Sequence, residues 1–296
     1  MNAVALLIGL GPLLGWGLFP TVAAKIGGKP VNQIIGTAFG TFIFALVYAL
    51  INGYALPSGI DLMWTILSGI GWASAQIITF MSFRMVGSSR AMPITTAFQL
   101  IGTSLWGVFV LGDWPGLAPK VVGFLALFVI IAGAYMTVWQ EHKTSSKAGV
   151  LSKAVGMLAV GEIGYLIYSA APQAAAAHGV NGQQAFLPQA IGMVIVGVVY
   201  GLVKSSPESK PLLEAVSYKH IISGFFFAFA ALTYLISAQP DMNGLATGFI
   251  LSQTSVVLAT LTGIWFLGEK KTKREMQVTM VGLVLILLAA TVTVMI

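Results

Sequence analysis

The apolar stretch "FGTFIFALVYALI" at residues 39–51 recurs in outline as "IGMVIVGVVYGLV" at residues 191–203, and this recurrence decides the fold. The two stretches align Gly40 with Gly192, 152 residues apart. Each lies in an uncharged run of about 20 residues, which is the length that an α-helix needs to cross the hydrocarbon core of a bilayer. The pair therefore points to a membrane protein that contains a duplication.

The composition of the whole chain agrees with a membrane location. Its 296 residues are 57% hydrophobic and 8% charged, with a mean hydropathy of +0.90. Because a soluble protein has about 25% charged residues, a soluble enzyme is excluded. The net charge of +6 resides in short loops between apolar runs, so we expect no nucleic-acid partner. The chain lacks cysteine and its three histidines are scattered (His142, His178, His220), so we expect no metal site and no cofactor.

Ten apolar runs are long enough to span a bilayer. The first is expected to be a spanning helix, because it lacks the basic start of a signal peptide. The predicted spans are 3–24, 31–52, 62–84, 91–112, 118–139, 152–172, 183–203, 219–238, 244–267 and 276–296.

Two further matches support the duplication. "ILSGIGW" at 66–72 resembles "IISGFFF" at 221–227, and "FVLGD" at 109–113 resembles "WFLGE" at 265–269. The three matches keep the same order, and their offsets all fall between 152 and 156 residues. A shared offset in a conserved order is stronger evidence than any of the matches alone.

Each half of the chain contains five predicted spans. An odd number places the second copy in the membrane upside down relative to the first. We therefore predict an all-α integral membrane fold, one membrane domain built from a five-helix repeat (residues 1–140) and its inverted copy (residues 141–296). Inverted repeats are typical of alternating-access transporters, whose substrate sites lie near the midplane between the halves.

The basic residues predict the orientation. Fourteen of the fifteen lysines and arginines lie at odd-numbered loops, and Lys120 is the exception. The positive-inside rule places the odd loops in the cytoplasm and both chain termini outside. The fourteen are Lys25, Lys29, Arg84, Arg90, Lys143, Lys147, Lys153, Lys204, Lys210, Lys219, Lys270, Lys271, Lys273 and Arg274.

Several stretches are similar to a known family. They include "LLIGLGPLLGWGLFPTVAAKIGGKPVNQIIG" at 6–36, "GEIGYLIYSAAPQA" at 161–174 and "SAQPDMNGLATGFILSQTS" at 237–255. The chain resembles the glucose/ribose porter family of the drug/metabolite transporter superfamily, and within it the bacterial ribose-uptake members. The resemblance implies the ten-helix drug/metabolite transporter fold and uptake of a monosaccharide, above all ribose, across the bacterial plasma membrane. It also implies a cavity lined by spans 1, 3, 4, 6, 8 and 9.

The polar residues within the predicted spans suit a sugar. A pentose presents hydroxyl groups, so its site needs neutral amides and hydroxyls together with aromatic faces. Gln99 and Gln253 lie 154 residues apart, as expected for a pseudo-symmetric central site. The alternative is that such residues join helices by hydrogen bonds or packing. The candidates for substrate binding are Trp16, Trp72, Gln76, Gln99, Glu162, Tyr165, Tyr234 and Gln253.

Glu162 is the acidic residue deepest inside a predicted span. A charge at the bilayer centre costs about 2.5–3.5 kcal/mol, so an intramembrane acid is a candidate functional residue. Three roles remain open: it binds and releases a proton during transport, it hydrogen-bonds the sugar, or it is a structural acid satisfied by a neighbour such as Tyr165 or a basic residue.

The leading hypothesis is secondary-active, proton-coupled uptake of a monosaccharide by alternating access, with no enzymatic activity. ATP is not expected to drive it, because the sequence has no Walker motif. The alternatives are uptake of glucose, facilitated diffusion of sugar, or efflux of small metabolites or drugs. If the exported drug were an amphipathic cation, Glu162, Tyr165 and Tyr168 could form an aromatic cage around it. The spans at 118–139 and 276–296 are almost wholly apolar, so we expect them to face lipid or to form a homodimer.

Overall fold

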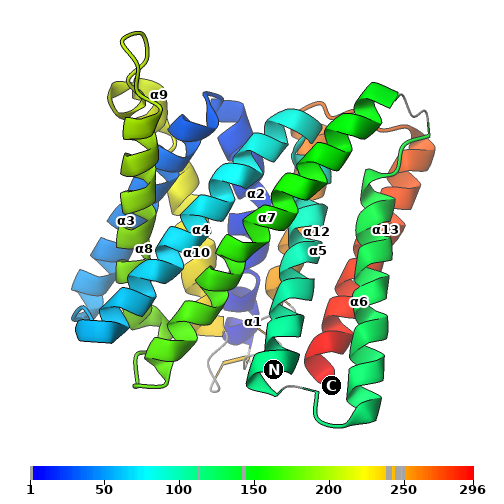
Figure 1. Cartoon of the computed structure of the whole chain (residues 1–296), viewed down its shortest axis with the longest axis horizontal. Coiled ribbons are helices and arrows are strands. Elements are labelled where there is room, and N and C mark those ends of the chain that lie inside the picture. Colours follow the sequence, from blue (N-terminus) through cyan, green and yellow to red (C-terminus); the bar gives the residue numbers. More distant parts are fainter. Residues whose placement is uncertain (1–2, 113, 142–144, 238–241, 244–247, 249–250) are drawn as a thin grey trace.

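The computed structural model describes residues 3–112, 114–141, 145–237, 242–243, 248 and 251–296, without the side chains of residues 111 and 145–148. In this part of the chain the regular structure is helical, and the helices run side by side as a bundle (Figure 1). The helices are α1 (Ala3–Gly9), α2 (Gly11–Ile26), α3 (Pro30–Asn52), α4 (Gly59–Val86), α5 (Ser88–Trp106), the π-helical turn η1 (Gly107–Leu111), α6 (Leu117–Val138), α7 (Ser145–Ala176), α8 (Gly182–Val203), the 3₁₀ turn η2 (Pro211–Leu213), α9 (Ala215–Lys219), α10 (Ile221–Ser237), α12 (Ser255–Phe266) and α13 (Lys273–Met295).

Within the described residues, nine helical segments are long and apolar enough to cross a membrane. The chain is therefore a multi-pass membrane protein. The predicted span at 244–267 begins outside the described residues, and its described part is the shorter apolar helix Leu251–Phe266. His142, Asp113 and most of 238–250 likewise lie outside the described residues.

The outer surface of the bundle is apolar, as a lipid-facing surface must be. At one edge α6 packs against α13 (Figure 1), and Leu125, Phe128 and Tyr135 are exposed on α6. Polar side chains such as Gln76 and Thr79 of α4 are buried in the interior instead. This distribution reverses that of a soluble protein and leaves the interior polar enough to hold a hydrophilic solute.

Two glycine contacts bring helices from the two halves of the chain together. A Cβ atom on Gly40 of α3 would lie 3.0 Å from Cα of Gly224 in α10, and one on Gly192 of α8 would lie 3.1 Å from Cα of Gly69 in α4. The sequence matches align Gly40 with Gly192 and Gly69 with Gly224, so these two contacts correspond to each other. Glycine is needed at all four positions because a side chain would separate the helices.

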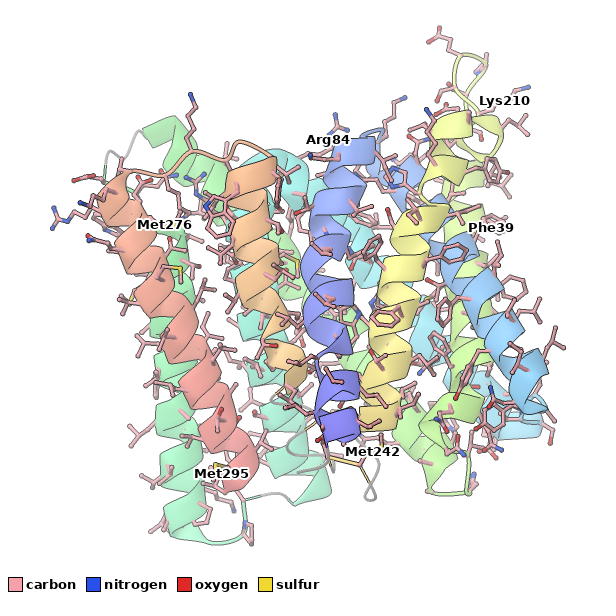
Figure 2. All side chains as sticks on the ribbon, turned by 180° about the vertical axis from the view of Figure 1, so that it is seen from behind. Phe39, Arg84, Lys210, Met242, Met276 and Met295 are labelled. Atoms are coloured by element: carbon pink, nitrogen blue, oxygen red, sulfur yellow. The ribbon has the colours of Figure 1, made fainter. Side chains whose placement is uncertain are left out.

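The two ends of the bundle differ in charge. Arg84 and Lys210 lie at one end, which we call the basic end, whereas Met242 and Met295 lie at the other (Figure 2). Both chain termini are at this second end, called the terminal end below (Figure 1).

Candidate functional site

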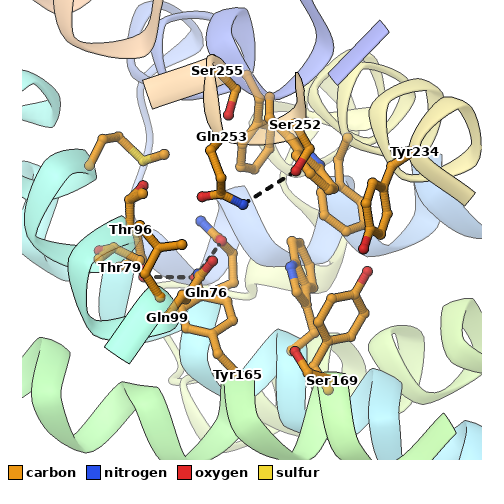
Figure 3. A pocket seen from close by; sticks show the side chains of 18 of the residues that line it. Gln76, Thr79, Thr96, Gln99, Tyr165, Ser169, Tyr234, Ser252, Gln253 and Ser255 are labelled. Atoms are coloured by element: carbon orange, nitrogen blue, oxygen red, sulfur yellow. Dashed lines mark hydrogen bonds between the residues drawn. The ribbon is translucent and has the colours of Figure 1, made fainter. Parts of the chain in front are cut away.

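A cavity of about 170 Å³ lies in the middle of the bundle (Figure 3). Side chains from α2, α4, α5, α7, α10 and the helix Leu251–Phe266 surround it, and none of the lining residues is charged. The lining consists of Trp16, Phe19, Trp72, Gln76, Thr79, Met92, Thr95, Thr96, Gln99, Leu100, Thr103, Tyr165, Tyr168, Ser169, Phe227, Tyr234, Ser252, Gln253 and Ser255.

The structure brings together seven of the eight residues that the sequence suggested for substrate binding. Figure 3 shows Gln76, Gln99 and Gln253 converging on one space from three different helical segments. The seven that line the cavity are Trp16, Trp72, Gln76, Gln99, Tyr165, Tyr234 and Gln253, and Glu162 is not among the lining residues.

Aromatic rings from α2, α4 and α10 form one wall of the cavity. The ring centroids of Trp72 and Phe227 are 4.0 Å apart, and those of Trp16 and Tyr234 are 6.0 Å apart. Trp72 is 4% exposed, so its ring is held by its neighbours. A rigid aromatic wall offers an apolar surface to the C–H face of a ring-shaped ligand.

A hydrogen-bond network orients the amide of Gln76. The hydroxyl of Tyr165 donates to Gln76 Oε1 at 2.9 Å and contacts Thr79 Oγ1 at 2.9 Å (Figure 3). Because the carbonyl oxygen of Gln76 is engaged, its Nε2 amide group is left to donate elsewhere. The Gln76 amide thus joins α4 to α7 through its oxygen, while its Nε2 group has no hydrogen-bond partner among the described residues.

Three polar atoms of the lining are buried without a hydrogen-bond partner among the described residues. They are Nε1 of Trp16, Nε2 of Gln76 and Oγ1 of Thr95. An unsatisfied buried polar group costs about 1–3 kcal/mol. A hydroxylated ligand that supplied the missing hydrogen bonds would relieve this cost, which makes the three atoms the strongest candidates for direct recognition.

Glu162 lies beside the cavity, at the contact between α7 and α5. The residue is 8% exposed, and neither carboxyl oxygen has a hydrogen-bond partner among the described residues. A Cβ atom on Gly102 of α5 would lie 2.6 Å from Glu162 Oε1, so the carboxyl group occupies space left by this glycine. Tyr165 bonds to Gln76 and Thr79 instead. Neither Tyr165 nor a basic residue among the described residues forms a hydrogen bond with Glu162.

A second, wider space of about 770 Å³ lies next to the cavity on the side of the terminal end, and we call it the vestibule. Thr103, Tyr168, Ser169 and Tyr234 line both spaces. The vestibule is bordered by Trp114 of the connection between α5 and α6 and by other residues near the terminal end, including Pro115, Gly182 and Ile296. The two spaces are therefore neighbours, separated by these shared side chains.

Toward the basic end the interior is packed. Thr21 Oγ1 of α2 donates to Thr262 Oγ1 of α12 at 2.7 Å, and Phe80 is fully buried on α4. The carboxylate of Glu269 accepts hydrogen bonds from the backbone N–H groups of Ser88 and Ser89 at 2.7 and 2.9 Å. It thereby caps the N-terminus of α5, where an anion is stabilised by the helix dipole.

Phe227 is a lining residue that the sequence analysis did not select. It lies in a run of aromatic residues that gives no indication of which ring faces inward. The match of "ILSGIGW" with "IISGFFF" aligns it with Trp72, the residue against which it packs, so this sequence match held a usable signal. Phe19 and Met92 also line the cavity, but apolar residues in a membrane span carry no comparable signal.

Comparison with known proteins identifies the family. The sequence model of the family described as "Sugar transport protein" matches residues 7–296. Over the full length of both chains, the protein is 72% identical to the "Putative ribose uptake protein RbsU" of Lactobacillus johnsonii and 70% identical to the protein of the same name from Enterococcus faecalis.

A solved structure described as "Crystal structure of protein" shares 14% sequence identity with the chain. It superposes with a TM-score of 0.67 and covers 99% of each chain, which shows a common fold. The family match and the full-length relatives lead to one conclusion: the chain belongs to the sugar transport protein family and is a membrane transporter.

Proposed function

We propose that this protein imports a monosaccharide through the central cavity. The observation that carries the proposal is a buried, uncharged cavity that combines an aromatic wall with unpartnered hydrogen-bonding groups. Its volume of about 170 Å³ is close to that of an engineered cavity of about 150 Å³ that holds one benzene ring. A single sugar ring is therefore the ligand class that fits both the size and the chemistry.

Ribose is the proposed substrate, and glucose is the alternative. Relatives that are 70–72% identical over the full length are named for ribose uptake. Efflux of an amphipathic cation is less well supported, because such a cation calls for an acid at the site and Glu162 is not part of the lining.

Transport is proposed to occur by alternating access between two inverted five-helix repeats, residues 1–140 and 141–296. The corresponding glycine contacts, Gly40 with Gly224 and Gly192 with Gly69, support this arrangement. The ten spans would place the basic end in the cytoplasm and both termini outside. In that orientation the vestibule would admit sugar from the outside, and motion of the repeats would then open the packed basic end.

Glu162 is the proposed proton site. Its carboxyl group faces α5 without a partner, and an unpartnered carboxyl inside a membrane is much more stable as the neutral acid. A shift of α5 against α7 would change the solvation of this group and allow it to release a proton on the other side. One proton moving through 100 mV yields about 2.3 kcal/mol, which sustains a sugar gradient of about 50-fold.

The experiment is uptake of labelled ribose into proteoliposomes, with and without an inward proton gradient and with glucose as competitor. We expect the gradient to drive accumulation of ribose by the wild type. Glu162→Gln, which mimics the neutral acid, should retain exchange and lose accumulation. If wild type and variant both merely equilibrate ribose, proton coupling is refuted, and preference for glucose would refute the substrate.

A further inference from the structure

A second concave site lies at the basic end, away from the central cavity. It has a volume of about 450 Å³, and we call it the basic pocket. Four cations line it from separate parts of the fold: Lys29 precedes α3, Arg84 lies in the last turn of α4, Lys153 lies near the start of α7, and Lys204 follows α8. No carboxylate is among its lining residues.

These cations are not neutralised by ion pairs with the described residues. Lys204 lies over the ring of Tyr200 at 5.6 Å, and Lys29 Nζ donates to Ser209 Oγ at 3.5 Å. Two other cations of the basic end are engaged: Lys271 Nζ donates to the carbonyl oxygen of Thr137 at 2.7 Å, and Arg274 lies 3.8 Å from the carboxylate of Glu141. The positive charge of the basic pocket is thus available to a ligand.

One acidic residue lies beside the basic pocket. The carboxylate of Glu214 accepts hydrogen bonds from Ser209 Oγ and from Asn32 Nδ2, both at 2.7 Å. These two bonds, assisted by the charge of Lys29, lower the pKa of Glu214 below its ordinary value. Glu214 therefore stays ionised and offsets part of the charge of Lys29, and the other three cations form no ion pair with the residues that the structure describes.

Apolar groups lie next to the cations on the side toward the membrane. Met157 follows Lys153 by four residues on α7, and Tyr200 precedes Lys204 by four residues at the end of α8, so each lies about one turn deeper than its lysine. Met81, also in the lining, lies one turn deeper than Met85 on α4. The pocket is thus cationic at its mouth and apolar beneath.

We infer that the basic pocket binds the phosphate of an anionic phospholipid in the leaflet at the basic end, with an acyl chain running down over Met81 and Met157. The positive-inside pattern explains how many cations this end carries. It does not explain why four of them surround one cavity with an apolar floor. Basic pockets between transmembrane helices are suited to such head groups. A free phosphate would gain nothing from the apolar floor.

The test is native mass spectrometry of the purified full-length protein after equilibration with phosphatidylglycerol or phosphatidylcholine. The double variant Lys153→Gln/Lys204→Gln removes two cations of the pocket. Lys270→Gln/Lys273→Gln is the matched control, because it removes two exposed lysines of the same end that lie outside the pocket. Each cation lost should weaken phosphatidylglycerol binding about fivefold.

Selective loss of phosphatidylglycerol from the pocket variant, with recovery in Lys153→Arg/Lys204→Arg, would support the inference. Equal loss from both glutamine variants would overturn it in favour of a general electrostatic attraction. Displacement of the lipid by inorganic phosphate would overturn the lipid assignment. Because lipid binding is measured without sugar, its failure is distinguishable from failure of the proposed transport.

Discussion

At the scale of single residues, Gln76 shows how the site is built. Its carbonyl oxygen is held by Tyr165 and its amide nitrogen is buried without a partner. We expect Gln76→Leu, which keeps the bulk and removes the amide, to weaken ribose binding about five- to tenfold, the effect of one lost hydrogen bond. The measurement is the concentration dependence of ribose uptake.

Gln277→Leu is the control for this variant, because Gln277 is exposed on α13 and does not line the cavity. It should leave ribose uptake unchanged. Equal uptake by the Gln76 variant and this control would show that the amide is not part of the sugar site.

The sequence indicated which polar and aromatic residues lie in the interior, but it did not indicate the direction in which each side chain points. Helical spacing and polarity selected seven residues that do line the cavity. Glu162 was selected with them, but its carboxyl group lies against Gly102 of α5. The direction of a side chain depends on which neighbouring helix leaves room for it. A glycine on another helix, 60 positions earlier in the chain, cannot be related to Glu162 from the sequence of its own helix.

At the scale of elements, glycine contacts set the spacing of the helices. A side chain at Gly192 would collide with the backbone of α4 at Ile66 and Gly69. Gly192→Leu should therefore destabilise the protein by about 1–3 kcal/mol or more, as overpacking does. The measurement is the temperature at which the purified protein is lost from its monodisperse chromatographic peak.

Gly156→Leu on α7 is the matched control, because a Cβ atom at Gly156 has no heavy atom within 4 Å. Both variants lose a helical glycine, so a difference between them isolates the helix contact. If Gly192→Leu and Gly156→Leu are lost from the peak at the same temperature, the close approach of α8 to α4 is not important for stability.

The cap on α5 gives a second prediction at this scale. Glu269→Gln keeps the shape of the side chain and removes the charge that interacts with Ser88 and Ser89. Because an anion at a helix N-terminus contributes about 0.3–2 kcal/mol, we expect a modest loss of thermal stability. Glu208→Gln, an exposed residue of the loop before α9, should have no effect. If the Glu269 variant is as stable as wild type, the charge of this carboxylate does not stabilise α5.

Nine of the ten predicted spans correspond to spanning helices among the described residues, whereas the cap could not be predicted. Each span is an apolar run of the required length, so it can be recognised on its own; the predicted 31–52 corresponds to α3, Pro30–Asn52. The cap joins residues 180 and 181 positions apart, and no local pattern relates "GSSR" to "LGE".

At the scale of the whole molecule, the proposed orientation makes a direct prediction. The chain contains no cysteine, so single cysteines can be introduced as reporters. A membrane-impermeant thiol reagent added to intact cells should label Lys120→Cys. The same reagent should label Lys210→Cys only after the cells have been permeabilised. The reverse labelling pattern would show that the chain has the opposite orientation in the membrane, with the vestibule on the cytoplasmic side.

Repeated motifs could be found in the sequence, but the position of the vestibule at the terminal end could not be predicted from it. Repeated motifs survive in each half and can be aligned. The position of such a space depends on how helices that are distant in the sequence pack together, which is a property of the assembled bundle. It follows from contacts such as that of Thr21 with Thr262, which are formed across the two halves.

The measurement that tests the central claim most directly is protection of a cavity cysteine by sugar. Ser169 lines both the cavity and the vestibule (Figure 3), and Ser169→Cys changes its size little. We predict that ribose slows the reaction of this cysteine with a thiol reagent, in a variant that still transports, and leaves the exposed Lys120→Cys unaffected. Equal reaction rates at Ser169→Cys with and without saturating ribose would show that the sugar does not occupy this cavity.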